Sequence, residues 1–349
     1  MPTLYSLHPR PLTTLFSEVE TYALSQLEVF VGTAGTVLQR RNASRFQFYA
    51  HQYYDALGNK RERYVAGPVG SEQADLSAAG LQSRIDDLKS IVPSIRLLGR
   101  EGFQFVDSRT FATVAALHNH GLFAAGAVLI GSHAYGALLN RFGVRAASYA
   151  TEDVDIARGG RLAFAGGKRS LLEVLRDSGI EFVEVPQLDA RAPATSFKQK
   201  GRSTFQVDLL APGRGEEIGS VAVPELAAQA VSLPYLGYLL EESQLTAVLA
   251  REGSCPVRVP LPERFAVHKL IVSTLRRGRD AKILRDRAQA ATFCSALAEL
   301  HPGALESAVK QAPRGAMKRL RQAIAAIRAT LEENHPRAWE ELERAIPGG

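Results

Sequence analysis

Two aspartates, Asp153 and Asp155, interrupt an apolar run that otherwise has the composition of a buried β-strand. The stretch reads EDVDIA over residues 152–157, with Val154 and Ile156 alternating with the acids. Side chains at i and i+2 of a strand project from the same face, so both carboxylates point the same way. Like charges held this close repel, and a fold tolerates them when a cation lies between them. Oxygen ligands of this kind select Mg²⁺ or Mn²⁺.

A third aspartate lies in another apolar segment, TFQVDLLAP at residues 204–212. Asp208 is flanked there by Val207 and Leu209, so it also interrupts a predicted strand. Three strand-borne aspartates can hold two divalent ions about 3.5–4 Å apart, the arrangement that suits phosphoryl transfer. Each aspartate alone could be a solubility residue on an edge strand. The set of three favours a metal site.

The dipeptide Gly131-Ser132 follows a predicted buried strand, AAGAVLIGS, and opens a predicted helix, HAYGALLNRFG. Glycine lets the backbone approach a ligand closely. We expect the serine to cap the helix, whose N-terminus attracts anions. The turn therefore suits a triphosphate, although a plain strand-to-helix turn with a serine cap would have the same sequence.

Gly-Ser after a strand, Asp-x-Asp in the next strand and a single Asp in a later one resemble the polymerase-β-like nucleotidyltransferase superfamily, over residues 109–300. The resemblance implies that a Gly-Ser turn holds the nucleotide phosphates. It also implies that three acids bind two metal ions and activate an acceptor hydroxyl. These roles fall on Gly131, Ser132, Asp153, Asp155 and Asp208.

The spacing departs from the common pattern, because the twenty residues 133–152 separate Ser132 from Asp153 and the superfamily usually has fewer. This longer segment is similar to a bacterial subgroup of uncharacterised nucleotidyltransferases. Two further motifs of that subgroup are present, TSFKQKGR at 195–202 and RFAVHKL at 264–270.

Basic side chains near the acids could neutralise a triphosphate or a leaving pyrophosphate. Lys198 and Arg202 precede the strand of Asp208, and Lys198 shares a strand face with Lys200. Lys269 lies on the helix that follows Pro262. A solvated surface is the alternative for these cations.

Four other residues are candidates for supporting roles around the nucleotide. Tyr135 could stack on a base, and His268 lies beside Lys269; for both, burial in the core is the alternative. Asp286 and Gln289, at i and i+3 of a predicted helix, could orient Lys269 or touch the base.

The order of predicted elements divides the chain into three parts. Residues 1–100 predict a helix and a small antiparallel sheet, residues 109–261 mix helices and strands, and residues 262–349 predict helices alone. The expected fold is α+β: a mixed-sheet nucleotidyltransferase core with a small N-terminal α+β domain and a C-terminal helical domain. The N-terminal elements expected are a helix at 12–30, strands between 32 and 67, and a linking helix at 71–91.

The net charge of +6 and the pI of about 9.4 favour an anionic partner such as nucleotide or nucleic acid. The N-terminus has no signal-peptide pattern, and no apolar run approaches the roughly 20 residues that span a bilayer. We therefore expect a cytoplasmic protein with no membrane partner. Cys255 and Cys294 lack metal-ligand spacing and are expected to be small core residues.

Two basic segments lie outside the expected core. Aromatic side chains beside cations can stack bases, and a basic helix face can follow an RNA backbone. A sheet core and a solvated helix face are the respective alternatives. The N-terminal segment contains Arg40, Arg41, Arg45, Phe46, Phe48, Tyr49, Tyr53 and Tyr54, and the C-terminal one contains Lys310, Arg314, Lys318, Arg319, Arg321 and Arg328.

The function expected is Mg²⁺-dependent or Mn²⁺-dependent transfer of a nucleoside monophosphate from an NTP, such as ATP, to an acceptor hydroxyl, with release of pyrophosphate. Acceptors in the superfamily include RNA 3′ ends, small molecules and protein hydroxyls, and the net charge favours RNA. A nucleotide-sugar glycosyltransferase can also use Asp-x-Asp, but it needs neither Gly-Ser nor a third strand aspartate. A catalytically inactive nucleotide-binding or RNA-binding protein is the other alternative, and the presence of all three acids argues against it.

Overall fold

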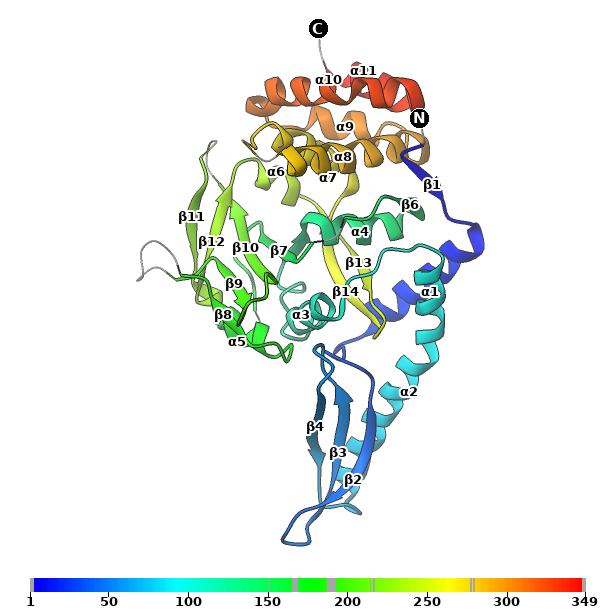
Figure 1. The fold of residues 1–349 in the computed structure, drawn as a ribbon, viewed down its shortest axis with the longest axis vertical. Helices are drawn as coiled ribbons and strands as arrows, with labels where there is room; N and C mark the ends of the chain where they lie inside the picture. Colours follow the sequence, from blue (N-terminus) through cyan, green and yellow to red (C-terminus); the bar gives the residue numbers. More distant parts are fainter. Residues whose placement is uncertain are drawn as a thin grey trace.

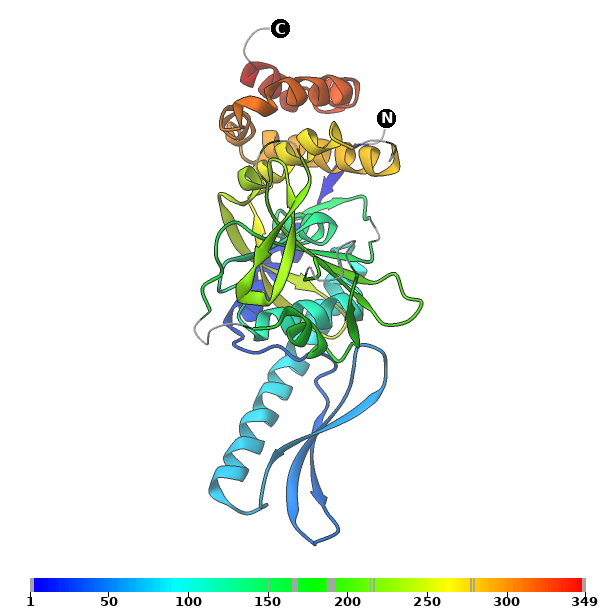
Figure 2. The ribbon, with the colours of Figure 1, turned by 90° about the vertical axis from the view of Figure 1, so that its left-hand side faces the viewer.

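The structure is a computed structural model that describes residues 3–149, 151–164, 169–186, 193–213, 215, 217–276, 278 and 280–346. It is an α+β fold arranged along one long axis (Figure 1). A small sheet with a long helix lies at one end, a mixed sheet lies in the middle, and a group of helices caps the other end (Figures 1 and 2).

Three antiparallel strands and a long helix form the N-terminal end. Their bounds are β2 Thr36–Arg41, β3 Gln47–Tyr54, β4 Lys60–Ala66 and α2 Glu72–Arg100. The hydroxyl of Ser71 caps α2 by accepting from the Ala74 amide. The helix extends beyond the predicted 71–91, because Ile95 and Leu98 of its last turns bury against Phe16 of another helix.

That other helix, α1 (Arg10–Ser25), packs against α2 and against a hairpin of the central part. It ends before the predicted residue 30, because the chain beyond Ser25 is bound to the core in extended form. The Gln26 side chain donates to the Ser254 carbonyl, and the Val29 amide donates to Asn119 Oδ1 at 2.7 Å.

The central sheet has the strand order β11-β12-β10-β7-β5. β7 and β10 are parallel neighbours, and β5 runs antiparallel to β7. The other edge of β10 is shared, since β9 pairs with its first half and β12 with its second, and β8 continues beyond β9. The bounds are β5 Ala127–Ile130, β7 Asp153–Arg158, β8 Phe182–Glu184, β9 Ser196–Gln199, β10 Gln206–Pro212, β11 Gly219–Val223 and β12 Ala228–Leu233.

Helices and short strands surround this sheet, and one continuous hydrophobic core joins them to it. Cys255 and Cys294 are both buried in that core, as expected, and neither forms a disulfide. The bounds are β1 Tyr5–Leu7, α3 Ser108–Asn119, α4 Gly131–Arg141, β6 Val144–Ala146, α5 Leu171–Arg176, α6 Leu236–Leu240, β13 Ser243–Leu249 and β14 Ser254–Pro260. β1 pairs with β6, and β13 pairs with β14.

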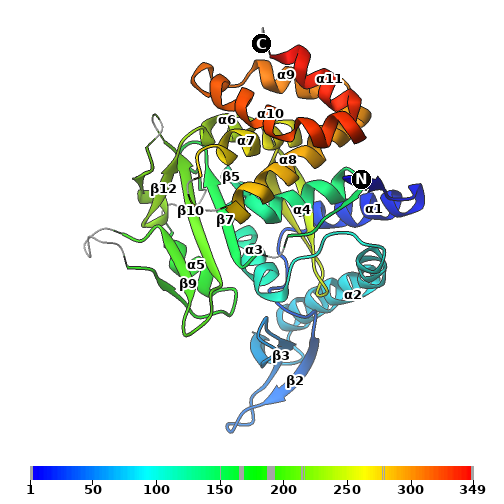
Figure 3. The ribbon, with the colours of Figure 1, turned by 45° about the horizontal axis from the view of Figure 1, so that its top comes forward.

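Helices alone form the C-terminal end, as predicted. The bounds are α7 Pro262–Ser273, α8 Asp280–Leu300, α9 Ala304–Lys310, α10 Met317–Asn334 and α11 Pro336–Ala345. The first turns of α8 lie beside β7, so the helices close over one end of the sheet (Figure 3). None of the helices in the described residues is long and apolar enough to cross a membrane.

Candidate active site

Three aspartates lie side by side on one face of the central sheet. The parallel register of β7 and β10 places Asp155 beside Asp208, and Asp153 beside Gln206. Residues in register on neighbouring strands project from the same face, as do residues i and i+2 of one strand. All three carboxylates therefore share a face, while Val154 between the first two is buried on the other side.

The Gly-Ser turn adjoins the same carboxylates. Ile130, the last residue of β5, pairs with Asp155, and Gly131 follows with φ +70°. A Cβ atom at residue 131 would overlap Oδ2 of Asp155, and the positive φ would strain any other residue, so glycine is favoured here. The predicted serine cap is wrong: α4 already begins at Gly131, and the Ser132 side chain, inside the first turn, makes no capping hydrogen bond.

Asp155 and Asp153 are poorly compensated. Burial raises the pKa of Asp155 to about 7, and the negative charges of Asp208 and Asp153 contribute to the rise. The positive charges of Lys269 and Lys282 only partly oppose it. Burial and the charge of Asp208 also raise the pKa of Asp153. The face therefore favours a bound cation or proton.

The donor set suits a hard divalent cation, because it offers only carboxylate oxygens and carries excess negative charge. Across the described ranges, no three His, Cys, Asp or Glu side chains are already grouped closely enough to hold an ion. Asp208 is engaged elsewhere, since Gln206 Nε2 donates to its two oxygens at 3.2 and 3.0 Å. An ion on this face would compete with that amide for Asp208.

Of the cations predicted near the third acid, Lys198 is placed on the acid face. The register of β9 and β10 pairs Lys198 with Gln206, which in turn pairs with Asp153. Lys200 instead forms an exposed ion pair with Glu181 at 2.5 Å. Arg202 lies exposed in the turn that follows β9.

Lys269 is held by a buried carboxylate on the neighbouring helix. Its Nζ lies 2.8 Å from Oδ1 of Asp286, and Nε of Arg276 lies 2.5 Å from Oδ2. Burial alone would raise the pKa of Asp286, but the two cations outweigh it and lower that pKa. The predicted contact between Asp286 and Lys269 is therefore present.

The remaining candidates lie in the interior. Tyr135 is only 1% exposed and packs against Phe265 and Phe293, so most of its ring is covered by core side chains. His268 is buried, and burial together with the charge of Lys269 lowers its pKa to about 3, which keeps it neutral. Gln289 is fully buried.

Comparison with known proteins decides the family. A family model described as "Nucleotidyltransferase" matches residues 108–314, more than half of the chain. The chain belongs to the nucleotidyltransferase family. No curated protein and no solved structure matched it. The match covers all three aspartates and Lys269, and excludes the N-terminal sheet and α10.

Two cations of this nucleotidyltransferase were missed from the sequence. The charges of Lys282 and Arg285, in the first turns of α8, both act on Asp153. With Asp286 and Gln289 they form a polar stripe at i, i+3, i+4 and i+7, which is one face of a helix. That spacing was the available signal, but it is also the pattern of a solvated helix face.

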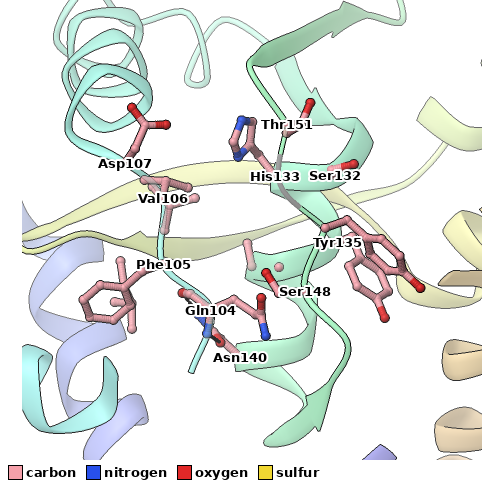
Figure 4. A pocket seen from close by; sticks show the side chains of 15 residues that line it. Gln104, Phe105, Val106, Asp107, Ser132, His133, Tyr135, Asn140, Ser148 and Thr151 are labelled. Atoms are coloured by element: carbon pink, nitrogen blue, oxygen red, sulfur yellow. Dashed lines mark hydrogen bonds between the residues drawn. The ribbon is translucent and has the colours of Figure 1, made fainter. Parts of the chain in front are cut away.

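A pocket of about 270 Å³ lies next to Ser132, between α4 and the segment of residues 104–107 (Figure 4). Thr151, two residues before Asp153, lines it and accepts a hydrogen bond from the Asp153 amide at 3.3 Å. The pocket therefore adjoins the acid face of the nucleotidyltransferase site.

Proposed function

We propose that this nucleotidyltransferase moves a nucleoside monophosphate from an NTP to an acceptor hydroxyl and releases pyrophosphate in a Mg²⁺-dependent reaction. One observation carries the proposal: the register of β7 and β10 puts Asp153, Asp155 and Asp208 on one face, directly beside Gly131. A nucleotide-sugar glycosyltransferase gains no support from the family match. An inactive binding protein would not need three repelling carboxylates to be kept together.

The reaction has a simple balance. The acceptor hydroxyl oxygen forms a bond to the α-phosphorus, and the bond from that phosphorus to the oxygen bridging to the β-phosphate breaks. Pyrophosphate leaves, and the hydroxyl proton passes to Asp208 or a neighbouring carboxylate. Two Mg²⁺ ions, or Mn²⁺, bound by the three aspartates would supply charge stabilisation for the attacking and leaving oxygens.

The triphosphate has candidate partners on three sides of the acids. We assign it to the start of α4 at Gly131 and Ser132, to Lys198 on β9 with Arg202 after it, and to Lys269 on α7. Backbone amides at a helix N-terminus and charged side chains are both usual phosphate ligands. Asp286 would hold Lys269 in position, because its carboxylate on the neighbouring helix α8 accepts a hydrogen bond from the Lys269 ammonium.

RNA is the acceptor that we favour, and the N-terminal sheet is the better of the two candidate surfaces. Phe46, Phe48 and Tyr64 form a row of rings with neighbouring centroids 6.3 and 5.6 Å apart, and Phe46 and Tyr64 are 40% and 56% exposed. The C-terminal helices are partly neutralised, since Lys310 and Arg328 form i,i+4 ion pairs with glutamates.

The test is an incubation of the full chain with each labelled NTP, Mg²⁺ and total cellular RNA, and then with total protein. We expect label on RNA, none after EDTA, and none with Asp153→Asn. Label on protein or on a metabolite would keep nucleotidyl transfer and reject RNA. No label from any NTP on any acceptor class would contradict the proposed function.

The RNA proposal has its own measurement. Phosphate contacts release counterions, so the affinity for RNA should fall steeply with salt. Replacing Arg41 and Arg45 by glutamine should reduce that slope and leave NTP affinity unchanged. Neutralising the C-terminal cations should have the smaller effect; the set is Arg314, Lys318, Arg319 and Arg321. The opposite order would move the RNA to the C-terminal helices.

A further inference from the structure

The pocket beside Ser132 is built by the segment that makes this chain unusual. Residues 133–152 lengthen the connection from the Gly-Ser turn to the first acid. After α4 and β6 the connection returns along the rim of the pocket, where Ser148, Tyr149 and Thr151 line it. The additional length therefore encloses a cavity next to the reacting groups.

The facing wall, residues 104–106, is hydrogen-bonded to two other elements. Gln104 lies on it, and both of its backbone groups bond to the side chain of Asn140 on α4, at 2.7 and 2.8 Å. Two residues on, the Val106 amide donates to the Leu249 carbonyl of β13 at 2.9 Å. Because α4 and β13 both hold this segment of the wall, its backbone is fixed by contacts within the protein.

The pocket is close to neutral. None of its lining residues is a lysine or arginine. Its one carboxylate, Asp107, is occupied as the cap of α3, accepting from the Thr110 hydroxyl at 2.7 Å and the Arg109 amide at 2.9 Å. Burial lowers the pKa of His133 to about 4, so this imidazole is uncharged at neutral pH. Such a lining does not suit a phosphate group.

The pocket nevertheless offers polar groups beside apolar side chains. The side-chain amide of Gln104 and the hydroxyls of Ser132 and Ser148 make no hydrogen bond to any residue that the structure describes. His133 Nε2 is buried and likewise lacks a partner among the described residues. Figure 4 shows these side chains around the opening, with Phe105 and Tyr135 at its sides. Apolar walls with a few convergent polar groups are typical of small-molecule sites.

From this geometry we propose that the pocket takes an uncharged nucleobase, with the Gln104 amide and the two serine hydroxyls at its polar edge. This inference rests on the proposed function, because nucleotidyl transfer supplies two sources of a base beside Ser132. One is the base of the NTP, and the other is the terminal base of a nucleic-acid acceptor. Both present the same chemistry to the pocket.

The experiment measures binding rather than turnover, so it does not depend on finding the acceptor. Adenosine, guanosine, cytidine and uridine are titrated into the full chain by ligand-observed NMR, alone and with saturating α,β-methylene ATP and Mg²⁺. Ser148→Trp blocks the rim. Gln104→Leu removes the amide, keeps the volume, and leaves the backbone bonds to Asn140 intact. Ala147→Trp, at the exposed neighbouring residue outside the lining, is the matched control.

At least one nucleoside should bind wild type and Ala147→Trp equally, and bind both pocket variants at least about tenfold more weakly. If the ATP analogue displaces it, the pocket holds the base of the NTP. If it binds alongside the analogue, the pocket holds the base of the acceptor. Circular dichroism checks that each variant is folded, and Gln104→Leu carries the test if Ser148→Trp does not fold.

Two results would overturn the inference. One is an absence of nucleoside binding to a wild-type chain that binds the ATP analogue. The other is nucleoside binding that neither pocket variant weakens. If the wild-type chain transfers label but the pocket variants bind nucleosides as well as wild type does, the pocket proposal is rejected and the proposed function is kept. If the pocket variants weaken nucleoside binding but no label is transferred to any acceptor, the pocket proposal is kept and the proposed function is rejected.

Discussion

Asp155 on β7 and Asp286 on α8 are two aspartates that share a neighbour, Lys269, and titrate in opposite directions. The pKa of Asp155 is raised to about 7 by burial and by two further carboxylates. The pKa of Asp286 is lowered, because Lys269 and Arg276 both bond to it. A carboxylate satisfied by the protein is part of the scaffold. Asp155 instead faces two other carboxylates, and we expect a cation to bind beside it.

The largest effect should come from removing a carboxylate of the acid face. Asp155→Asn should lower the rate of nucleotidyl transfer by about 10³-fold or more, because a metal ligand is lost at constant shape. Initial rates with labelled NTP measure this. Asp87→Asn, an exposed aspartate on α2, is the control and should keep the wild-type rate. A near-normal rate in Asp155→Asn would remove that residue from the reaction.

Replacing Asp286 should reduce the stability of the fold more than it reduces the rate of transfer. Asp286→Ala leaves Lys269 and Arg276 without their partner, and breaking a buried pair in this way costs about 3–5 kcal/mol. Urea unfolding gives the value. Adding Lys269→Met to Asp286→Ala should recover part of the loss, since one uncompensated charge is then removed. An Asp286→Ala protein as stable as wild type would mean that the pair is not a scaffold.

Stabilisation of the fold by a bound divalent ion should depend on Asp155 and not on Asp286. Mg²⁺ at about 100 times its Kd should stabilise the wild-type chain by about 2.7 kcal/mol, and EDTA should reverse the gain. The gain should be larger at pH 8 than at pH 5.5, because protons compete for Asp155 at the lower pH. In thermal melting, Mg²⁺ should stabilise Asp286→Asn and should not stabilise Asp155→Asn. Equal stabilisation of both variants would place the ion elsewhere.

The smallest effect expected is on the stability of the metal-free chain. The pKa of Asp155 is 3.8 in the unfolded chain and about 7 in the folded chain. Below pH 3.8 the carboxyl is protonated in both states and does not lower the stability. As the pH rises toward 7 the unfolded chain loses this proton first, so the free energy of unfolding falls. In EDTA, the free energy of unfolding of Asp155→Asn relative to wild type should therefore increase by about 1–3 kcal/mol from pH 4 to pH 8. This is less than the full pKa shift would give, because solvent screens part of the interaction. Urea unfolding at the two pH values tests this. A loss of stability at pH 8 would mean that the carboxylate is compensated after all.

The sequence determined the acid face more clearly than its surroundings. Alternation of Asp153, Val154 and Asp155 fixes one face by local geometry alone. The contact of Asp155 with Asp208 depends on strand register across about fifty residues, which no local pattern encodes, so it rested on the family resemblance. The family match confirmed that resemblance.

The helical half was less predictable. The contact of Asp286 with Lys269 was one of two roles considered for Asp286, and only the packing of α7 against α8 decides between them. Lys282 and Arg285 were missed, because cations on the first turns of a helix usually face solvent. β11 and β12 were also missed, because their residues alternate weakly; β12 joins the sheet by pairing with β10, and β11 by pairing with β12.

The register of β7 and β10 has a consequence for how the chain can vary. Backbone pairing fixes the spacing between Asp155 and Asp208, so the length of the chain between the two strands does not set it. Peptides inserted in the surface connections would leave the carboxylates where they are. Deleting Val207 alone would turn Asp208 to the buried face, because strand side chains alternate. Tolerance to insertion should therefore be high between these strands and absent within them.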